Sequence, residues 1–281
     1  MILIADGGST KTNWCFLKEK GERLFVDTEG YNPYFVNSDY IKKSLHLGFD
    51  DQINKEDVSE VYFYGSGCFS ETAGIVGGAI EQVFKHAKVS IELDLLAAAR
   101  ALLGSSPGFA AILGTGTNTC LYDGEKIIKN IDSLGFILGD EGSGTAMGKR
   151  LLGDYIRGYM STEVEALFWK EFELTKEQIF QQVYSNSLAN RFCSSFARFI
   201  HQHIYIPYIA DLVESCFKLF FENLVSGYTS YREYAFNCIG SIGDVFADQI
   251  KKVAADFGMQ TGVIIKSPLD GLIAYHSTAR K

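Results

Sequence analysis

The sequence contains few cysteines, and they follow no pattern. The six are scattered over 281 residues, and none lies in a C-x-x-C pair. Zinc sites and disulfide frameworks require clustered or regularly spaced cysteines, so the sequence indicates neither, and we expect reduced, mostly buried thiols. The six are Cys15, Cys68, Cys120, Cys193, Cys216 and Cys238.

Positive charge is also scarce. The chain has 26 lysine and arginine residues against 34 aspartate and glutamate residues, a formal net charge of −8. Nucleic acids and anionic membranes bind basic surfaces, so this balance argues against both as main partners. An anionic small molecule is still compatible, because backbone N–H groups and a metal ion bind phosphate locally whatever the net charge.

Long apolar runs and leader-like segments are missing as well. No window approaches the length of a membrane span, and no basic region with a long apolar stretch precedes the first expected strand. No DNA-binding segment is recognisable at either end. We therefore expect a cytoplasmic protein with no membrane or nucleic-acid partner.

The chain has enough apolar sequence for sizeable cores. Hydrophobic residues make up 47% and aromatic residues 14%, which excludes a disordered or low-complexity chain. The length exceeds that of a typical single domain, so we expect two domains with a site between them. Ser105–Gly108 (SSPG) breaks the pattern as a hinge, giving domains over 1–106 and 107–267, and the helix over 268–281 can join the first.

The order of expected elements occurs twice. Each half begins with three strands joined by turns, which predicts an antiparallel meander, and continues with helices and further strands. This repetition predicts a duplicated α/β protein. In the first half we expect strands at 2–6, 13–18, 23–28, 61–64 and 89–93, with helices at 38–48 (capped by Ser38), after Ser70, and at 95–103. In the second we expect strands at 109–113, 117–122, 126–131, 234–239 and 263–265, with helices at 175–185, 188–203, 208–228, 244–257 and after Pro268.

Two Gly/Thr loops each follow an apolar strand. They are Asp6–Thr12 (DGGSTKT) and Gly114–Asn118 (GTGTN). Glycines let backbone N–H groups approach an anion and threonines add hydroxyl donors, so both loops are typical of phosphate binding. Neither has the spacing of a P-loop or a dinucleotide-binding fold. Glycine and threonine are also ordinary hairpin residues, but two such loops favour a clamp on one phosphate chain.

The order of these motifs resembles that of the actin-like ATPase superfamily of sugar kinases, actin and heat-shock chaperones. Asp6–Thr12 resembles its first phosphate motif, Gly114–Asn118 the second, and Cys238–Gly243 (CIGSIG) the adenosine motif. Leu138–Gly144 (LGDEGSG) is similar to a segment of the N-acetylglucosamine kinase branch, which is grouped with the BadF/BadG ATPases. The resemblance implies two related ribonuclease H-like α/β domains, each a mixed five-stranded sheet with flanking helices, and a cleft between them.

The resemblance also implies the reaction: ATP- and Mg²⁺-dependent phosphorylation of an amino sugar, above all of N-acetylglucosamine to its 6-phosphate. Asp6 would hold Mg²⁺ through water, although an Asp-Gly pair is also typical of a plain turn. Lys11 would add charge at the phosphates, although a lysine at a hairpin tip is usually solvated. The nucleotide-binding candidates are Gly8, Thr10, Lys11, Gly114, Thr115, Gly116 and Thr117 for phosphate, and Gly240, Ser241 and Gly243 for adenosine.

Asp94 is the candidate catalytic residue. It ends the strand at 89–93 and begins the following helix, where the resemblance places the family's aspartate. As general base it would accept the proton of the attacking sugar hydroxyl, which typically contributes about 10²–10⁴ in rate. An aspartate at a helix N-cap also needs no catalytic role, because free N–H groups and the helix dipole stabilise it there.

A sugar pocket requires amides and carboxylates at fixed positions. The candidates are Asn32, Asn118, Asp140 and Glu141. Asn32 precedes a proline and is also consistent with a plain turn, and Asp140-Glu141 with a cap of the helix expected near Ser143. Gly65–Gly67 (GSG) after a strand is a further candidate lining, or a tight exit from that strand. Leu134-Gly135 stands where human-type members carry a tryptophan-glycine pair.

Other functions fit parts of the pattern. A kinase for N-acetylmuramic acid or glucosamine would share the catalytic parts and differ in the pocket. A dehydratase-activator-type ATPase needs cluster cysteines, for which only Cys193 and Cys216 are available, each in an amphipathic helix. Zinc-bearing glucokinase-like kinases have a cysteine cluster that is missing here. A non-catalytic sensor would lack the acids Asp6 and Asp94. The aromatic residues between Phe168 and Tyr234 leave room for a homodimer surface.

Overall fold

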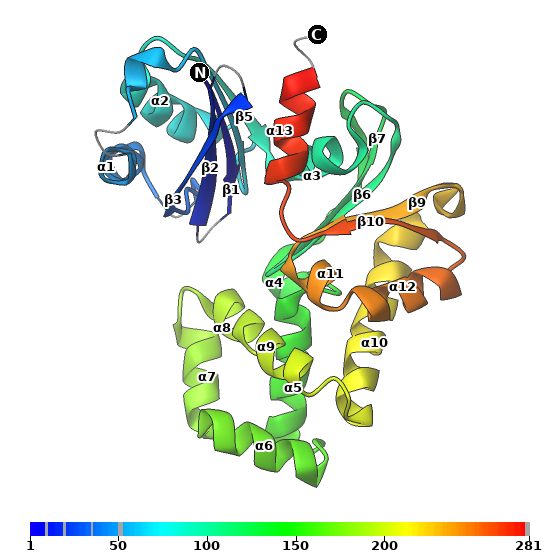
Figure 1. Cartoon of the computed structure of the whole chain (residues 1–281). Coiled ribbons are helices and arrows are strands. Elements are labelled where there is room, and N and C mark those ends of the chain that lie inside the picture. Colours follow the sequence, from blue (N-terminus) through cyan, green and yellow to red (C-terminus); the bar gives the residue numbers. More distant parts are fainter. Residues whose placement is uncertain (9–10, 19–20, 35, 50–52, 279–281) are drawn as a thin grey trace. The chain divides into compact units, whose positions relative to one another are not determined.

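The computed structural model describes residues 1–8, 11–18, 21–34, 36–49 and 53–278 (Figure 1). The chain divides into two compact units. Unit 1 comprises Met1–Ser106, Gly124–Lys126 and Pro268–Lys281, and unit 2 comprises Pro107–Asp123 and Ile127–Ser267.

Unit 1 contains a five-stranded mixed sheet with the order β3-β2-β1-β4-β5. The first three strands pair antiparallel, so the expected meander is present, whereas β1, β4 and β5 run parallel. Because parallel strands end at the same edge, the residues that follow β1, β4 and β5 lie together there. The strands are β1 (Ile2–Gly7), β2 (Lys11–Leu17), β3 (Arg23–Glu29), β4 (Glu60–Gly65) and β5 (Lys88–Leu93).

Helices cover both faces of this sheet. Alternate residues of β1 point to opposite faces, so Leu3 packs with α1 and α2, whereas Ile2 and Ile4 pack with α3 and α13. The C-terminal helix α13 contributes Leu272 and Ile273 to that second cluster. The helices are α1 (Ser38–Gly48), α2 (Ala73–Val83), α3 (Asp94–Leu103) and α13 (Leu269–Thr278), with a 3₁₀ turn at Lys55–Asp57.

Two expected helix caps in unit 1 are wrong. Asn37, not Ser38, caps α1 by accepting a hydrogen bond from the N–H of Tyr40, and the Ser38 hydroxyl instead donates to the carbonyl of Ile75. Thr72, not Ser70, precedes α2, and its side chain makes no cap bond. In each case a nearby polar residue occupies the N-cap position in place of the expected serine. Tertiary contacts decide which residue takes that position.

Unit 2 repeats the sheet topology in the order β10-β9-β6-β7-β8. An antiparallel meander of three strands is again followed by two parallel strands, which confirms the expected duplication. The two-domain α/β fold class inferred from the sequence is therefore confirmed. The strands are β6 (Gly108–Leu113), β7 (Thr117–Tyr122), β8 (Ile127–Asn130), β9 (Ala235–Ile239) and β10 (Gln260–Ile265).

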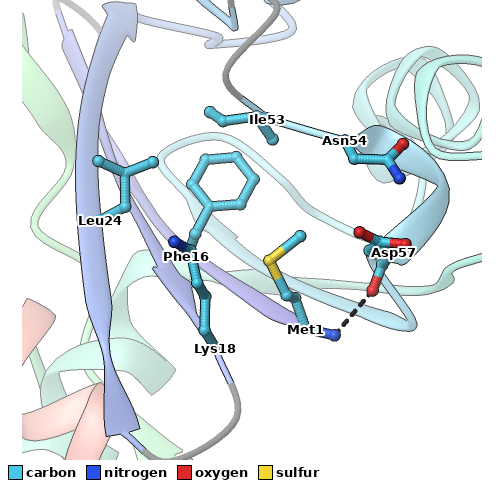
Figure 2. A pocket seen from close by; sticks show the side chains of 7 residues that line it. All are labelled: Met1, Phe16, Lys18, Leu24, Ile53, Asn54 and Asp57. Atoms are coloured by element: carbon cyan, nitrogen blue, oxygen red, sulfur yellow. Dashed lines mark hydrogen bonds between the residues drawn. The ribbon is translucent and has the colours of Figure 1, made fainter.

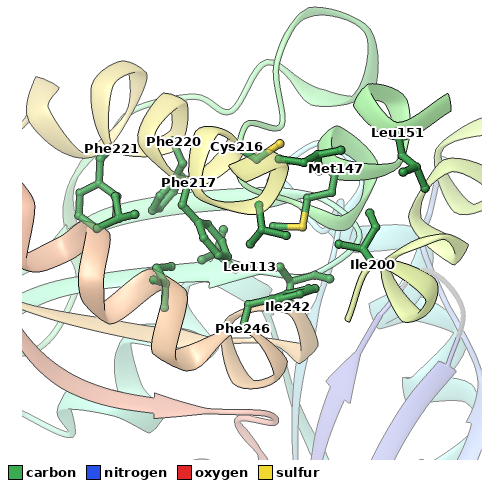
Figure 3. Packing of buried hydrophobic residues seen from close by; sticks show 14 of the residues in the cluster. Leu113, Met147, Leu151, Ile200, Cys216, Phe217, Phe220, Phe221, Ile242 and Phe246 are labelled. Carbon is green, nitrogen blue, oxygen red and sulfur yellow. The ribbon is translucent and has the colours of Figure 1, made fainter. Parts of the chain in front are cut away.

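Unit 2 also carries most of the described helices, the larger part between β8 and β9 and the rest between β9 and β10. They bury a large aromatic core against one face of the sheet, where Leu113 meets Phe217, Phe220 and Phe246 (Figure 3). The expected helix at 188–203 is interrupted at Phe196, and the one at 208–228 ends at Asn223. The helices are α4 (Gly135–Leu138), α5 (Gly144–Arg157), α6 (Thr162–Phe172), α7 (Lys176–Ser185), α8 (Ala189–Ser195), α9 (Ala197–Gln202), α10 (Pro207–Asn223), α11 (Ser241–Val245) and α12 (Ala247–Asp256).

All six cysteines are buried and free, as expected. Among the helices of the described residues, none combines the length and apolar character needed to cross a membrane.

Candidate functional site

In unit 1, two carboxylates lie at the edge where the parallel strands end. Asp6 is the penultimate residue of β1, and Asp94 is the first residue of α3, directly after β5. The N-cap position of α3 is Leu93, so Asp94 is not the cap that its sequence position also allowed. Its Oδ1 accepts a hydrogen bond of 2.8 Å from the N–H of Leu95.

The two carboxylates influence each other. Burial, and after it the nearby negative charge of Asp94, raises the pKa of Asp6 to about 6. Burial also raises the pKa of Asp94, against which the Leu95 N–H and the Ser66 hydroxyl favour the ionised form. Within the described part of the chain, no group donates a hydrogen bond to the Asp6 carboxylate. A divalent cation would offset both the burial and the repulsion, so this pair fits Mg²⁺.

The β1–β2 hairpin bends tightly beside Asp6. The N–H of Gly8 donates to the carbonyl of Lys11 at 2.9 Å, and a Cβ on Gly7 would stand 2.5 Å from the Phe63 ring. The Lys11 ammonium forms an ion pair of 2.8 Å with Asp27 on β3, with both side chains about half exposed. Lys11 is therefore engaged by the neighbouring strand. The predicted phosphate ligand Thr10 lies outside the described residues.

Residues that follow two further strands, β3 and β4, also belong to this site. Asn32, after β3, is buried and accepts a hydrogen bond at Oδ1 from the N–H of Tyr34, which is the turn expected as its alternative role. Gly67, after β4, has a φ of +76°, and a Cβ there would lie 2.8 Å from Asn32 Oδ1. Its neighbour Ser66 donates its N–H to the carbonyl of Gly7 at 2.9 Å, and the Ser66 side chain partly offsets the burial that raises the pKa of Asp94.

Unit 1 thus connects Asn32, Ser66, Asp94, Asp6 and the Gly7-Gly8 turn through direct or charge contacts. Sequence reasoning gave Ser66 only as part of a segment lining the site, without a partner. The available signal was the Gly-Ser-Gly run after a strand, which is the composition of a loop that other backbone approaches closely.

In unit 2, the β6–β7 loop is anchored in a way that leaves two N–H groups available. The N–H of Gly114 donates to Gly116 and that of Thr117 to Asp140 Oδ1. The N–H groups of Thr115 and Gly116 meet no acceptor among the described residues. A Cβ on Gly114 would meet nothing within 4 Å, so the loop has open space beside it. This arrangement fits phosphate binding by backbone donors.

The loop carbonyls are held by the first turn of α5. The N–H of Gly144 donates to the carbonyl of Gly114 at 2.9 Å, and the Thr145 hydroxyl donates to that of Thr115 at 2.6 Å. Ser143 caps α5 by accepting from the N–H of Ala146, so Asp140 and Glu141 are not its cap. The loop carbonyls are therefore held by hydrogen bonds from within the unit itself.

The three sugar-binding candidates of unit 2 surround Thr117. Asp140 has a φ of +61°, and burial raises its carboxyl pKa against the favourable hydrogen bond from Thr117. Glu141 accepts the Thr117 hydroxyl at its carbonyl and the Asn223 amide at its carboxylate, both at 2.8 Å. Asn118 Oδ1 accepts from the Asn130 amide at 2.8 Å. Asp140 is therefore committed in part to ordering the loop.

Close packing explains both glycines of the predicted adenosine segment. Gly240 has a φ of +125°, and a Cβ there would stand 2.2 Å from the carbonyl oxygen of Leu113. A Cβ on Gly243 would stand 2.6 Å from the sulfur of Cys238. Ser241 is the first residue of α11, a helix of five residues. The adenosine role of these residues stays a prediction.

A cavity of about 370 Å³ lies at the opposite end of β1 from Asp6 (Figure 2). Phe16 and Ile53 form part of its apolar lining, and the N-terminal amine of Met1 donates to the carbonyl of Asp57 at 2.7 Å beside it. The cavity contains none of the predicted site residues, so the site described above is separate from it.

Comparison with known proteins gives matches among solved structures. No protein-family model matches the chain, and no curated protein does. A protein of Porphyromonas gingivalis, provisionally named N-acetylglucosamine kinase, is 36% identical, with a TM-score of 0.94 over 100% of both chains. A protein of Chromobacterium violaceum with the same provisional name is 15% identical, with a TM-score of 0.67 over 98% of each chain. A ROK family glucokinase of Streptomyces griseus, solved with glucose and AMPPNP, is 14% identical, with a TM-score of 0.56 over 99% of each chain.

Proposed function

Because the chain belongs to the actin-like ATPase superfamily, in the same family as the Porphyromonas gingivalis protein, we propose that it is an ATP-dependent sugar kinase. We propose N-acetylglucosamine as the sugar and its 6-hydroxyl as the phosphate acceptor. The observation that carries the proposal is the 36% identity over both whole chains to a protein provisionally named for that activity. The acids and loops of the two units support it independently.

Phosphoryl transfer requires a group that accepts the proton of the attacking hydroxyl. Asp94 suits this role, because its carboxyl pKa is raised by burial and the Leu95 N–H fixes one of its oxygens. The remaining oxygen can receive the proton. Holding the acceptor in one orientation removes the entropy cost of finding it at the moment of reaction.

The phosphates require donors and a counter-charge. We assign the N–H groups of Thr115 and Gly116 and the turn at Gly8 to the phosphate oxygens of ATP. Asp6 would hold Mg²⁺, which when bound would neutralise part of the phosphate charge. The absence of a hydrogen-bond donor at Asp6, among the described residues, supports this assignment, because a metal ion would supply the missing partner.

The sugar would be bound by Asn32 in unit 1 and by Asn118, Asp140 and Glu141 in unit 2. Amides and carboxylates can accept and donate to neighbouring hydroxyls and to an acetamido group. A kinase for glucosamine or N-acetylmuramic acid would use the same acids and loops. A dehydratase-activator-type ATPase is less well supported, since Cys193 and Cys216 are both buried in the aromatic core of unit 2.

A coupled ADP-release assay tests the proposal. Purified protein with Mg²⁺ and ATP is mixed with N-acetylglucosamine, glucosamine, glucose, N-acetylmannosamine or N-acetylmuramic acid. We expect low ADP release without sugar and a large increase with N-acetylglucosamine, and mass spectrometry should find the 6-phosphate. A larger increase with another amino sugar would identify that sugar as the substrate in place of N-acetylglucosamine. No increase with any sugar would overturn the kinase assignment.

A further inference from the structure

The side-chain amide of Asn118, near the start of β7, is held in one orientation. Its Oδ1 accepts a hydrogen bond of 2.9 Å from the N–H of Thr119 and one of 2.8 Å from Nδ2 of Asn130 on β8. We propose that Asn130 is a positioning residue for Asn118, and that Asn118, so held, offers only N–H donors and selects an acceptor oxygen of the substrates. The proposal rests on the proposed function, which places Asn118 among the substrate-binding residues.

Backbone groups of Thr119 decide which atom of each amide is the oxygen. The N–H of Thr119 can only donate, so the Asn118 atom that it contacts is the oxygen. The carbonyl of Thr119 can only accept, so the Asn130 atom that lies 2.7 Å from it is the nitrogen. Turning either amide over would place two donors or two acceptors against each other.

The nitrogen of Asn118 is left for a ligand. No group among the described residues accepts a hydrogen bond from Asn118 Nδ2, and this atom is not one of the fully buried polar atoms that lack a partner. The residue itself is partly exposed. Because Oδ1 already accepts two hydrogen bonds, the side chain offers a ligand two N–H donors and no free acceptor.

The neighbouring residues supply the opposite character. The N–H of Thr117, which precedes Asn118, is bonded to a carboxylate oxygen of Asp140, and Glu141 follows Asp140. Sugar hydroxyls can donate to these two carboxylates. Asn118 as held cannot receive such a proton, so it requires an oxygen that accepts without donating.

Two oxygens of the proposed reaction meet this requirement. They are the carbonyl oxygen of the acetamido group of the sugar and the phosphate oxygens of ATP. The protonated amine of glucosamine does not meet it, because that group only donates. With the carbonyl as its ligand, Asn118 would favour N-acetylglucosamine over glucosamine.

Asn118→Asp tests the donor character directly. It keeps an oxygen for Thr119 and Asn130 and replaces the free nitrogen with a second oxygen. With the sugar carbonyl as ligand, the KM for N-acetylglucosamine should rise about tenfold or more, the KM for ATP should stay within about twofold, and the KM for glucosamine should fall. With a phosphate oxygen as ligand, the KM for ATP should rise by that factor with either sugar.

Either of these two patterns supports the donor contact and identifies its source. Unchanged KM values for both substrates, whatever the effect on kcat, would overturn the inference. An equal rise in the KM values for ATP and sugar would overturn it as well, because one donor pair would then not select one oxygen.

Asn130→Ala tests the positioning role. We expect the KM that rises in Asn118→Asp to rise about threefold here, with kcat within about twofold. The control is Asn186→Ala, at an exposed asparagine of unit 2 whose Nδ2 donates to Gln182, and it should match the wild type. In an Asn118→Ala background, Asn130→Ala should have little further effect. The same rise in both backgrounds, or an equal rise in Asn186→Ala, would overturn the role of Asn130.

A measurement without substrates separates this inference from the proposed function. The side-chain N–H resonances of Asn130 report its bond to Asn118. They should move in Asn118→Asp, where the acceptor becomes charged, and stay in place in Asn186→Ala. Unmoved resonances in Asn118→Asp would overturn the inference even in an active kinase. Moved resonances in a protein that no sugar stimulates would support the held amide and overturn the kinase assignment alone.

Discussion

The two units have the same strand order, yet different types of residue lie at the ends of their strands. In unit 1, β1 ends beside Asp6 and β5 is followed by Asp94, whereas in unit 2, β6 ends at Leu113 and β10 is followed by Lys266. Both units have a glycine-containing hairpin after the first strand of the sheet. The duplicated fold therefore supplies a glycine-containing hairpin twice and a pair of acids once.

The difference shows which features come from the fold and which were added to one copy. A hairpin after an apolar strand is part of the topology, so both copies contain it. The carboxylates are costly to bury and repel each other, so unit 1 has a site of lower stability that a cation would relieve. Both units bury their first strand, and unit 2 does so against the larger apolar core.

The largest expected effect comes from the acid that only unit 1 possesses. Asp94→Asn keeps the shape and removes the proton acceptor, so kcat should fall about 10²- to 10⁴-fold. Calorimetry with a non-hydrolysable ATP analogue should show nearly unchanged affinity. The control is Lys266→Gln at the corresponding position of unit 2, which should change kcat less than about threefold. A normal kcat in Asp94→Asn would show that the acid present only in unit 1 is not the proton acceptor.

Two glycines of unit 2 should respond differently to a methyl group. Gly240→Ala places Cβ against the Leu113 carbonyl at a positive φ, so we expect the free energy of unfolding to fall by about 3 kcal/mol or more.

Gly114→Ala has open space, so its unfolding free energy should change by less than about 1 kcal/mol. Its ATP affinity should fall about fivefold, because the methyl group stands where phosphate would approach the loop. Chemical denaturation and calorimetry measure the two effects. Equal stability losses in both variants would show that the unit 2 loop is only a hairpin.

Mild acid should weaken unit 1 through His276. Burial, helped by the charge of Arg100 and opposed by Glu60, lowers the His276 pKa to about 4 from 6.5. The Nε2 atom lies 2.8 Å from the Tyr64 hydroxyl, inside the unit. Above pH 6.5 the imidazole is neutral in both folded and unfolded chains. As the pH falls from 6.5 to 4, the unfolded chain binds the proton first, so stability is lost, by about 3 kcal/mol.

Tryptophan fluorescence can measure this acid-induced loss of stability in unit 1 alone. Trp14 is fully buried there, and Trp169→Phe removes the other tryptophan. In that background, His276→Gln should lose less stability than its parent between pH 7 and pH 4, and His201→Gln, at an exposed histidine of unit 2, should follow the parent. Parallel pH curves for His276→Gln and the parent would contradict the assignment.

The smallest effect is expected at Lys11. Its ammonium is paired with Asp27 at the surface, and exposed ion pairs contribute little. Lys11→Gln should change the unfolding free energy by less than about 0.5 kcal/mol and raise the KM for ATP less than about threefold. A tenfold rise in that KM would show that the lysine leaves Asp27 for phosphate.

The sequence predicted the local parts of the fold best. Both meanders and the strand before Asp94 follow from apolar runs and turn residues that are neighbours in the chain. The cap at Asn37 and the interruption at Phe196 depend on contacts with other elements, which local patterns do not contain. The bond between Tyr64 and His276 joins residues 212 positions apart, and no spacing rule could indicate it.

The site was predictable in its residue types but not in its connections. Asp6 and Asp94 follow strands that the pattern placed, and their proximity results from β1, β4 and β5 being parallel. The contact between Asp140 and the N–H of Thr117 spans 23 residues and requires a positive φ at Asp140. Sequence reasoning assigned this aspartate to sugar or to a cap, and its bond to the loop came only from the structure.

The position of α13 has a consequence for synthesis of the chain. Ile2 and Ile4 leave the ribosome before unit 2 is made, but Leu272 and Ile273, which pack on them, are translated after the whole of unit 2. A nascent chain must therefore carry this sheet face covered by α3 but not yet by α13 while more than a hundred further residues are added. Unit 1 therefore begins first in the chain but is completed last, and a chaperone that shields exposed strands would act longest on the sheet of unit 1.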